Sequence, residues 1–437
     1  MRSGASPSTQ RTGGLMLGII NQPPRESTPR KMPRIPTSLL LRAYREHPLL
    51  PLLLKECRTL DTARNELRWL RESALRDARQ HSLTRTRLGW RTRLRTMCHK
   101  RSQGVPLQYI LGDQPFGELE ILCRRGVLIP RSDTESYTYE AARLIRQMAL
   151  ETDKDSPSPS SKTRPLRILD LCTGTGCMAL LLHALLASHF EKIQIMGLDL
   201  SPIALDLAHR NLEHNISLGA LDSRAREEIR FHRADVLSSH SSASPSATPG
   251  ISASNIPTVE DLLSKYITRP NSESQPQSTH ETSRLPKIDL LISNPPYIST
   301  TDFHNGTTAR SVRLFEPRLA LVPPTDAHTN TNAVGKLGDK PEDIFYRRIL
   351  GLSLAVEASI TVLECGDRMQ AERVVGMFWG MSGSRERQCE GQGGGDGFTA
   401  EVWPDTEEDC LANGFHGRDG SRCVIIRRVR SGGIDTI

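Results

Sequence analysis

The sequence predicts an α/β protein with a mostly parallel sheet, covered by helices on both faces and preceded by a small helical domain. Strand-like apolar runs alternate with helical patterns from Arg167 to about residue 430, a rhythm typical of a parallel sheet. A glycine loop, Cys172-Thr-Gly-Thr-Gly176, follows the first of these runs. In front of them, apolar residues recur at helical spacing from Pro36 to about Arg101.

The bulk composition fits two domains plus linkers. The chain has 437 residues, 37% of them hydrophobic and 24% charged. Aromatic residues make up only 5%, so no stacking array for single-stranded nucleic acid is expected. Residues 1–104 hold 22 basic and seven acidic side chains, a net charge of +15, against −8 for the rest. This basic part could meet RNA, a ribosome-like partner or an acidic protein surface, although solvated arginine faces give the same count.

The nine cysteines contain no Cys-x-x-Cys pair, which is typical of a reducing compartment. Cys172 and Cys177 flank the glycine loop without further ligands in view, so no metal site is expected. Charged residues interrupt the most hydrophobic stretch, Leu39–Leu54, so no membrane span is predicted.

The front part divides into four segments. Residues 1–34 are rich in Arg, Ser, Thr and Pro, which is typical of a mitochondrial targeting leader or of a disordered tail. Residues 35–104 form the helical domain. Residues 105–150 read as a connector, a hairpin and a helix capped by Ser132 or Asp133. The Ser-Pro repeats of 151–164 predict a polar linker.

Residues 165–430 contain the predicted sheet. Five strands are expected in the first and central parts, at 167–171, 193–198, 229–232, 288–292 and 360–364. Two more candidate strands, 398–403 and 422–427, lie near the end. Helices are expected at 178–190, 202–214, 342–356 and 368–379. Two insertions interrupt the pattern: 237–285, expected to be largely disordered, and the glycine-rich 380–397.

The glycine loop predicts a site for a ligand that backbone N–H groups can approach closely. Because Gly174-x-Gly176-x-x-Ala179 also satisfies a relaxed dinucleotide pattern, the loop does not exclude a nicotinamide cofactor. Asp199, after the second strand, is placed to accept both hydroxyls of a ribose, and Asp235, after the third, to lie near an adenine edge. For each Asp the alternative is a helix cap or a turn. S-adenosylmethionine, an adenosine ligand without pyrophosphate, fits this set.

The Asn294-Pro-Pro-Tyr297 sequence follows the fourth strand and indicates a clamp for a planar amino group. The Asn oxygen and a proline carbonyl can each accept one N–H, while the Tyr ring covers the group. Proline fixes φ and donates no N–H, so nearby carbonyls are free to face a ligand. A base or an amide would fit equally, and the alternative is an ordinary proline-rich turn. The clamp favours S-adenosylmethionine as the ligand of the loop.

Five segments occur in order: Pro106-Leu-Gln-Tyr-Ile-Leu-Gly112, Leu128-Ile-Pro-Arg-x-x-Thr-Glu135, Asp170-x-x-Thr-Gly-Thr-Gly176, Asn294-Pro-Pro-Tyr297 and Phe315-Glu-Pro317. Together they resemble the release-factor glutamine N5-methyltransferases over roughly residues 36–427. Asn-Pro-Pro-Tyr alone is shared with adenine N6 methyltransferases. The Leu-Ile-Pro-Arg segment and the helical domain make the resemblance specific.

The resemblance implies a Rossmann-like class I methyltransferase sheet of seven strands, with S-adenosylmethionine as methyl donor. The implied acceptor is the glutamine of a Gly-Gly-Gln motif in a peptide-chain release factor, recognised by the helical domain. The leader favours a mitochondrial location over a cytoplasmic one. The implied donor-binding residues are Asp170, Cys172, Thr173, Gly174, Thr175, Gly176, Asp199, Asp235, Val236 and Asn294, and the implied glutamine-holding residues are Asn294, Pro295, Pro296 and Tyr297.

Three points stay open. Cys172 stands where the family has a glycine, a replacement that is tolerable if its φ is negative. Glu135 and Glu316 line the site or serve in salt bridges and caps. The function could instead be adenine N6 methylation of DNA or RNA, but the chain has no base-reading module and few aromatics, so direct nucleic-acid binding is not expected. A second alternative is a binding module without enzymatic activity that keeps the methyltransferase fold as a scaffold. The presence of Gly174, Gly176, Asp199 and Asn294 argues against it.

Overall fold

The computed structural model describes residues 34–80, 89–155, 164–238, 256–266, 285–324, 340–383, 397–404 and 422–429. The expected leader, most of the Ser-Pro linker and most of both predicted insertions lie outside these residues.

The first four helices pack around one hydrophobic core. They are α1 (Thr37–Glu46), α2 (Leu50–Cys57), α3 (Leu60–Gln80) and α4 (Trp90–Ser102). Buried side chains at helical spacing, such as Leu50, Leu53 and Leu54 of α2, meet Leu70 of α3 and Leu94 of α4. The helical periodicity of the sequence is confirmed here.

The connector contains one element that the sequence did not predict. Pro106 precedes a short helix, α5 (Leu107–Leu111), which ends at Gly112 with a positive φ of 98°. The hairpin of β1 (Asp113–Phe116) and β2 (Leu119–Leu122) follows, and α6 (Ser132–Asp155) comes next. The predicted linker began at residue 151, but α6 continues to Asp155, where Ser156-Pro157 follows in the sequence.

The remaining strands make one seven-stranded sheet. They are β3 (Leu166–Leu171), β4 (Ile193–Asp199), β5 (Ile229–Arg233), β6 (Leu290–Ser293), β7 (Ile360–Glu364), β8 (Gly397–Trp403) and β9 (Cys423–Val429). Their order is β5-β4-β3-β6-β7-β9-β8, and β9 runs antiparallel to both of its neighbours. The predicted seven-stranded, mostly parallel sheet is confirmed.

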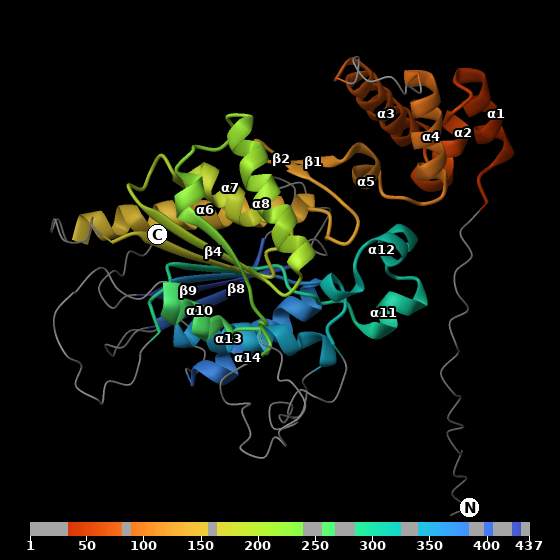
Figure 1. Ribbon diagram of the computed structural model, residues 1–437. Coiled ribbons are helices and arrows are strands. Elements are labelled where there is room, and N and C mark those ends of the chain that lie inside the picture. The colour runs from red at the N-terminus through yellow and green to blue at the C-terminus, as the bar shows by residue number, and fades with distance from the viewer. Residues whose placement is uncertain are drawn as a thin grey trace, which may run out of the picture. The chain divides into compact units, whose positions relative to one another are not determined.

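Helices cover both faces of the sheet (Figure 1). One face packs against α6, α7 (Cys177–Leu186) and α8 (Pro202–Ser217), the other against α10 (Val259–Tyr266), α13 (Ile344–Ala355) and α14 (Arg368–Ser382). Neighbours in one strand, such as Ile168 and Leu169, therefore enter different cores and are both fully buried. Continuous burial explains why the strands read as unbroken apolar runs. Short helices complete the fold: α9 (Ala225–Glu228), α11 (Thr300–Asn305), α12 (Arg310–Phe315), η3 (Arg318–Ala320) and η4 (Pro341–Asp343).

The first insertion contains one helix that the sequence analysis did not name. Helix α10 buries Val259, Leu262 and Leu263 against the sheet, and Arg348 of α13 forms an ion pair with Glu260 at 2.7 Å. The sequence signal was an i, i+3, i+4 apolar pattern inside a polar stretch.

Candidate active site

The candidate site lies where the sheet changes its direction of growth. From β3 the chain adds β4 and β5 on one side, and then β6 and β7 on the other, so β3 and β6 are neighbours. The carboxyl ends of neighbouring parallel strands at such a point form a crevice in which ligands bind. The glycine loop follows β3 and the Asn-Pro-Pro-Tyr sequence follows β6. Ser293 Oγ donates to the Leu171 carbonyl at 2.8 Å and holds these two ends together.

The glycine loop has a left-handed backbone at three positions: Cys172 (φ 61°), Gly174 (φ 56°) and Gly176 (φ 80°). The φ of Cys172 is positive, so the condition under which a cysteine would fit this position without strain is not met. A cysteine there bears a steric cost that glycine would avoid, and the surrounding loop holds it in place. The Thr173 N–H donates to the Leu198 carbonyl at 2.9 Å, and the Gly174 N–H donates to Asp199 Oδ2 at 2.9 Å.

The two glycines differ in their surroundings. A Cβ on Gly176 would come within 3.0 Å of the Phe231 ring and 3.1 Å of Ala208, so this position is closed by packing. A Cβ on Gly174 would meet only the Cys172 carbonyl, at 4.0 Å, and otherwise point into open space. The open side of the loop is therefore over Gly174, at the N-terminal end of α7.

Three of the predicted donor-binding side chains are buried under the loop. Asp170 accepts from Thr173 Oγ1 at 2.6 Å, and Asn211 Nδ2 donates to the Thr175 carbonyl at 2.9 Å. Asp170, Thr173 and Thr175 are each no more than 3% exposed. Burial raises the pKa of Asp170 to about 7, although the Thr173 hydroxyl opposes the shift. These side chains shape the loop from below, which leaves backbone groups to face a ligand.

Asp199 and Asp235 are both half-buried at strand ends. Asp199 accepts from the N–H groups of Gly174 and Ser201, at 2.9 and 2.8 Å, and so joins the loop to β4. Asp235 accepts from the Leu237 N–H at 3.0 Å and from Ser238 Oγ at 2.7 Å, which is turn geometry. Each carboxylate has further lone pairs for a ligand. Val236 is buried, and its carbonyl accepts from Arg348 at 3.1 Å.

The Asn-Pro-Pro-Tyr sequence starts directly beyond β6. Pro295 and Pro296 are buried, while Asn294 and Tyr297 are half-buried. Asn294 Nδ2 donates to Thr134 Oγ1 at 3.2 Å, and its side-chain oxygen has no donor in the part of the chain that the structure describes. The Tyr297 ring packs against Gly366, where a Cβ would lie 3.1 Å from Cδ2. Burial raises the pKa of the Tyr297 phenol, so this group stays neutral.

Sequence reasoning missed two residues, Thr134 and Glu364, that contact this sequence. Glu364 ends β7, is 3% exposed, and accepts from Thr134 Oγ1 at 2.6 Å and from the Tyr297 hydroxyl at 3.3 Å. Burial raises its pKa to about 7 against the effect of these hydrogen bonds. The sequence held one signal for Glu364, which is a carboxyl group at the end of an apolar strand. Thr134 was visible only as one letter of the Leu128–Glu135 segment.

Glu316 and Glu135 have structural contacts. Glu316 accepts from the Ile129 N–H at 3.1 Å and from the Arg131 guanidinium at 2.6 Å, and so fixes the Leu-Ile-Pro-Arg segment. Glu135 lies in the first turn of α6, where a carboxylate favours the helix dipole.

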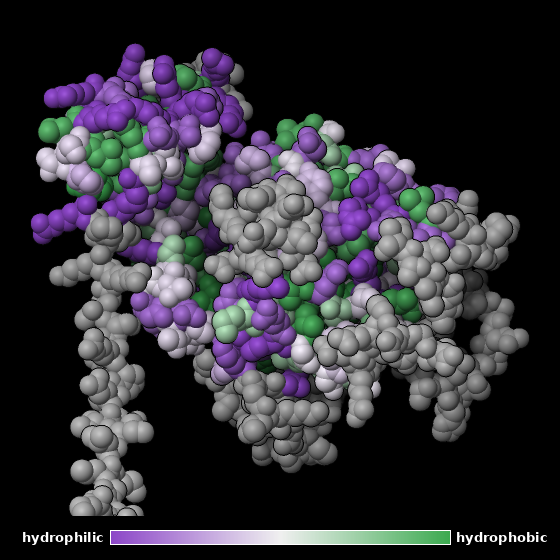
Figure 2. All heavy atoms as spheres, turned by 180° about the vertical axis from the view of Figure 1, so that it is seen from behind, coloured by the Kyte–Doolittle hydropathy of each residue, from purple (hydrophilic) through white to green (hydrophobic). Residues whose placement is uncertain are grey.

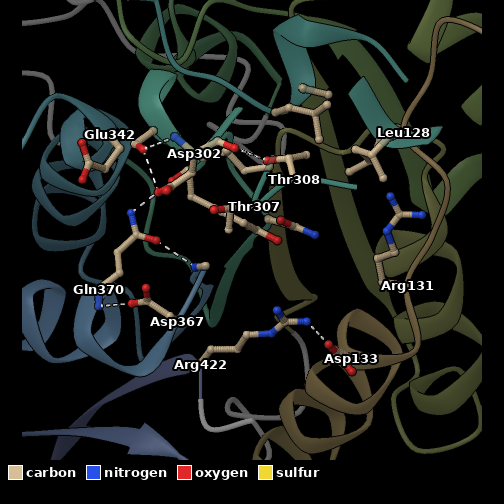
Figure 3. A pocket seen from close by; sticks show the side chains of 18 of the residues that line it. Leu128, Arg131, Asp133, Asp302, Thr307, Thr308, Glu342, Asp367, Gln370 and Arg422 are labelled. Carbon is tan, nitrogen blue, oxygen red and sulfur yellow. Dashed lines mark hydrogen bonds and ion pairs between the residues drawn. The ribbon is translucent and has the colours of Figure 1, made fainter. Parts of the chain in front are cut away.

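A cavity of about 470 Å³ opens beside Asn294 and Tyr297. Figure 3 shows that its wall combines Arg131 and Asp133, Thr307 and Thr308 near α12, Gln370 of α14, and Arg422 at the start of β9. Arg422 forms an ion pair with Asp133 across the wall. The glycine loop and Asp199 are not among the lining residues.

Within the described residues, no cluster of three or more His, Cys, Asp or Glu residues could hold a metal ion. Among their helices, none is long and apolar enough to cross a membrane.

Sequence comparison identifies relatives of this chain. The mitochondrial MRF1 N(5)-glutamine methyltransferase MTQ1 of Saccharomyces cerevisiae is 35% identical over 317 residues, 72% of this chain and 76% of that protein. A relative from Schizosaccharomyces pombe is 31% identical over 66% of this chain and 73% of its own length. The release factor glutamine methyltransferase of Chlorobaculum tepidum is 33% identical over 53% of this chain and 57% of its own length.

No family model matches the chain. Among solved structures, the N-terminal domain of human METTL16 has a TM-score of 0.37 at 15% identity, over 76% of this chain and 81% of that chain, a likeness too low to bear on function. The relatives, at up to 35% identity over most of both chains, decide the assignment. The protein belongs to the release-factor glutamine N5-methyltransferase family.

Proposed function

We propose that this enzyme transfers a methyl group from S-adenosylmethionine to the side-chain amide nitrogen of the glutamine in a release factor's Gly-Gly-Gln motif. The observation that supports this best is the position of Asn294, which lies at the switch point of the sheet, one strand from the glycine loop and at the wall of a cavity. The relatives named as glutamine methyltransferases support the choice of an amide over a base.

The residues present fit S-adenosylmethionine. Gly174 leaves open space over the loop for a ligand that approaches the backbone. The half-buried carboxylate of Asp199 can accept ribose hydroxyls while it holds the loop. Asp235 and Val236, beyond β5, are placed to border the adenine. When bound, the cofactor supplies an electrophilic methyl group on a sulfonium.

The chain's own residues orient the acceptor. An amide nitrogen is a poor nucleophile because its lone pair is delocalised into the carbonyl. The Asn294 side-chain oxygen and a proline carbonyl of the same turn accept the two N–H bonds, which aligns the lone pair and favours the pyramidal nitrogen. As the N–C bond forms and the methyl–sulfur bond breaks, leaving a neutral thioether, the nitrogen becomes acidic and its proton leaves to water, so no strong base is needed.

A direct test combines the full-length enzyme, S-adenosylmethionine labelled in its methyl group, and a release factor. We expect label on the Gly-Gly-Gln glutamine and none on a factor in which that glutamine is alanine. Asn294→Ala should lower turnover by at least roughly 100-fold with unchanged cofactor affinity in calorimetry, whereas Asn305→Ala, on the exposed end of α11, should match the wild type. Label on DNA or RNA instead of the release factor would contradict the proposal.

We further propose that the acceptor is a mitochondrial release factor and that residues 35–104 recognise it. The mitochondrial names of the yeast relatives support the location. In Figure 2 the helical part of the chain, at the upper left, shows hydrophilic side chains around a hydrophobic patch. Its exposed side chains include Arg68, Arg71 and Arg91, which lie over the rings of Trp69 and Trp90. An acidic patch on a protein partner would complement this surface.

A further inference from the structure

We propose that Thr134 and Glu364 are positioning residues that fix the orientation of the Asn294 side-chain amide and so select an acceptor that offers N–H groups. The inference rests on the proposed function, because it concerns how the same site chooses its acceptor.

Asn294 could fit its place in two orientations. Rotation by 180° exchanges the amide oxygen and nitrogen with little change of shape, so neighbouring hydrogen bonds must choose between them. A threonine hydroxyl alone cannot make this choice, because it can accept from an NH2 group or donate to an oxygen. The contact between Thr134 and Asn294 at 3.2 Å therefore needs a further constraint.

Glu364 supplies that constraint. Its carboxylate only accepts, and Thr134 Oγ1 lies 2.6 Å from Oε2, so the single proton of the threonine hydroxyl is committed to Glu364. Toward Asn294 the hydroxyl can then only accept. Asn294 must present its NH2 group to Thr134, and its oxygen remains for the acceptor. The reversed amide would place NH2 against the NH2 of the glutamine.

The same carboxylate also holds Tyr297. The phenol donates to Oε1 at 3.3 Å, so one buried group joins both ends of the Asn-Pro-Pro-Tyr sequence. Thr134 and Glu364 are each 3% exposed and lie on different elements, α6 and β7. Thr138, one turn further along α6, donates to the Thr134 carbonyl at 2.7 Å. The hydroxyl is thus held by a helix and a central strand rather than by a loop.

The orientation depends on the charge of Glu364. If the carboxyl group is protonated, it can donate to Thr134, and the threonine proton is free to turn to Asn294. Burial raises the pKa of Glu364 to about 7, so the change falls near neutral pH. The ionisable groups that act on Glu364, or on which it acts, are Arg131, Tyr137, Cys177, Tyr297, Tyr346, Cys365 and Cys423. Burial raises the pKa of each of these thiols and phenols, so they stay neutral, and Glu364 is the group that titrates.

The test compares four variants of the full-length enzyme in single-turnover methylation of a release factor. Thr134→Val keeps the shape and removes the hydroxyl, and should lower the rate roughly 100-fold with unchanged cofactor affinity. Thr134→Ser keeps a hydroxyl, so its methylation rate should lie within a few-fold of the wild-type rate. Thr138→Val is the matched control, because it removes a buried hydroxyl from the same helix without touching Asn294, and should keep the wild-type rate. Glu364→Gln should be slow at pH 8.

The pH profile provides a second readout. The wild-type rate should fall about tenfold per unit below pH 7, and Glu364→Gln should show no such fall. The proposal is overturned if Thr134→Val and Glu364→Gln, both folded by circular dichroism, methylate within about twofold of the wild type. It is also overturned if Thr138→Val loses as much activity as Thr134→Val.

A measurement without acceptor separates this inference from the proposed function. The Asn294 side-chain NH2 resonance, identified by its absence in Asn294→Ala, should show one proton protected from exchange in the wild type and in Thr138→Val. Thr134→Val should lose that protection. If the wild type methylates no release factor but this pattern holds, the proposed acceptor fails while the positioning role stands. If methylation occurs without the protected proton, only the positioning role fails.

Discussion

Gly174 and Gly176 share a positive φ but differ in what surrounds them, and this separates their contributions to binding and stability. At Gly176 a methyl group would collide with Phe231 and Ala208. At Gly174 it would enter the space from which a ligand approaches the loop. The same substitution therefore tests two different properties.

We expect Gly174→Ala to weaken S-adenosylmethionine binding at least tenfold while it lowers the free energy of unfolding by only about 1 kcal/mol, the cost of a left-handed alanine. Gly176→Ala should cost roughly 2 to 3 kcal/mol because overpacking adds to that strain. Gly219→Ala is the matched control, since Gly219 has a φ of 73° with no atom within 4 Å of a Cβ. Calorimetry and urea unfolding measure both quantities. Equal cofactor loss in Gly174→Ala and Gly219→Ala would contradict the open side of the loop.

The carboxylate form of Glu364 lowers the stability of the folded protein, because the group is buried. Burial raises its pKa from 4.5 to about 7, so the folded protein binds its proton more tightly than the unfolded chain does. The stabilisation is complete below pH 4.5 and is lost as the pH rises through about 7. The carboxylate that orients Asn294 is thus the less stable form of this group.

The wild type should lose on the order of 3 kcal/mol of unfolding free energy through this group between pH 4.5 and pH 8, by 1.36 kcal/mol per pKa unit. Glu364→Gln should remove that part of the pH dependence and be relatively more stable at pH 8. Asp170, whose pKa burial also raises to about 7, should remain as a second source of the slope. Urea unfolding at pH 5 and pH 8 measures the change in unfolding free energy between these pH values. The same change in Glu364→Gln as in the wild type would contradict the prediction.

At the scale of elements, the helical domain and the sheet have separate cores, so changes on the surface of one can leave the chemistry of the other intact. The guanidinium groups of Arg71 and Arg91 lie 5.8 and 4.6 Å from the centre of the Trp90 ring. Such stacking holds two exposed charges in place at a modest cost in entropy.

Reversal of both charges, Arg71→Glu with Arg91→Glu, should raise the KM for the release factor about tenfold at low salt and leave kcat and cofactor affinity unchanged. The control is Arg146→Glu with Arg230→Glu, two exposed positions on α6 and β5. Steady-state kinetics at two ionic strengths measure the effect. An equal rise of KM in the control pair would assign it to net charge rather than to this surface.

At the scale of the whole molecule, one prediction concerns location. A tagged full-length protein should enter mitochondria, and deletion of residues 1–34 should leave it in the cytoplasm, because an Arg-rich segment with a single acidic residue is typical of import signals. Deletion of that segment should not change methylation by the purified enzyme. Mitochondrial import without residues 1–34 would contradict the prediction.

Local patterns predicted most of the fold. Apolar runs, glycines and caps identified all seven strands of the sheet and the helical front part, because each pattern depends on neighbours in sequence. Neither α5 in the connector nor α10 in the polar insertion was named in the sequence analysis, which also ended α6 too early. The first two elements bury apolar side chains in the hydrophobic clusters, which composition alone does not show.

The sequence by itself determined the glycine loop, the Asn294–Tyr297 clamp and the strand ends that carry Asp199 and Asp235. It could not identify Thr134 and Glu364, because they lie 230 positions apart and meet only when α6 packs beside β7. Nor does the residue type reveal that Cys172 has a positive φ of 61°. Which end of the Asn294 amide faces the acceptor was decided by the tertiary structure, since only a buried carboxylate can commit the proton of a neighbouring hydroxyl.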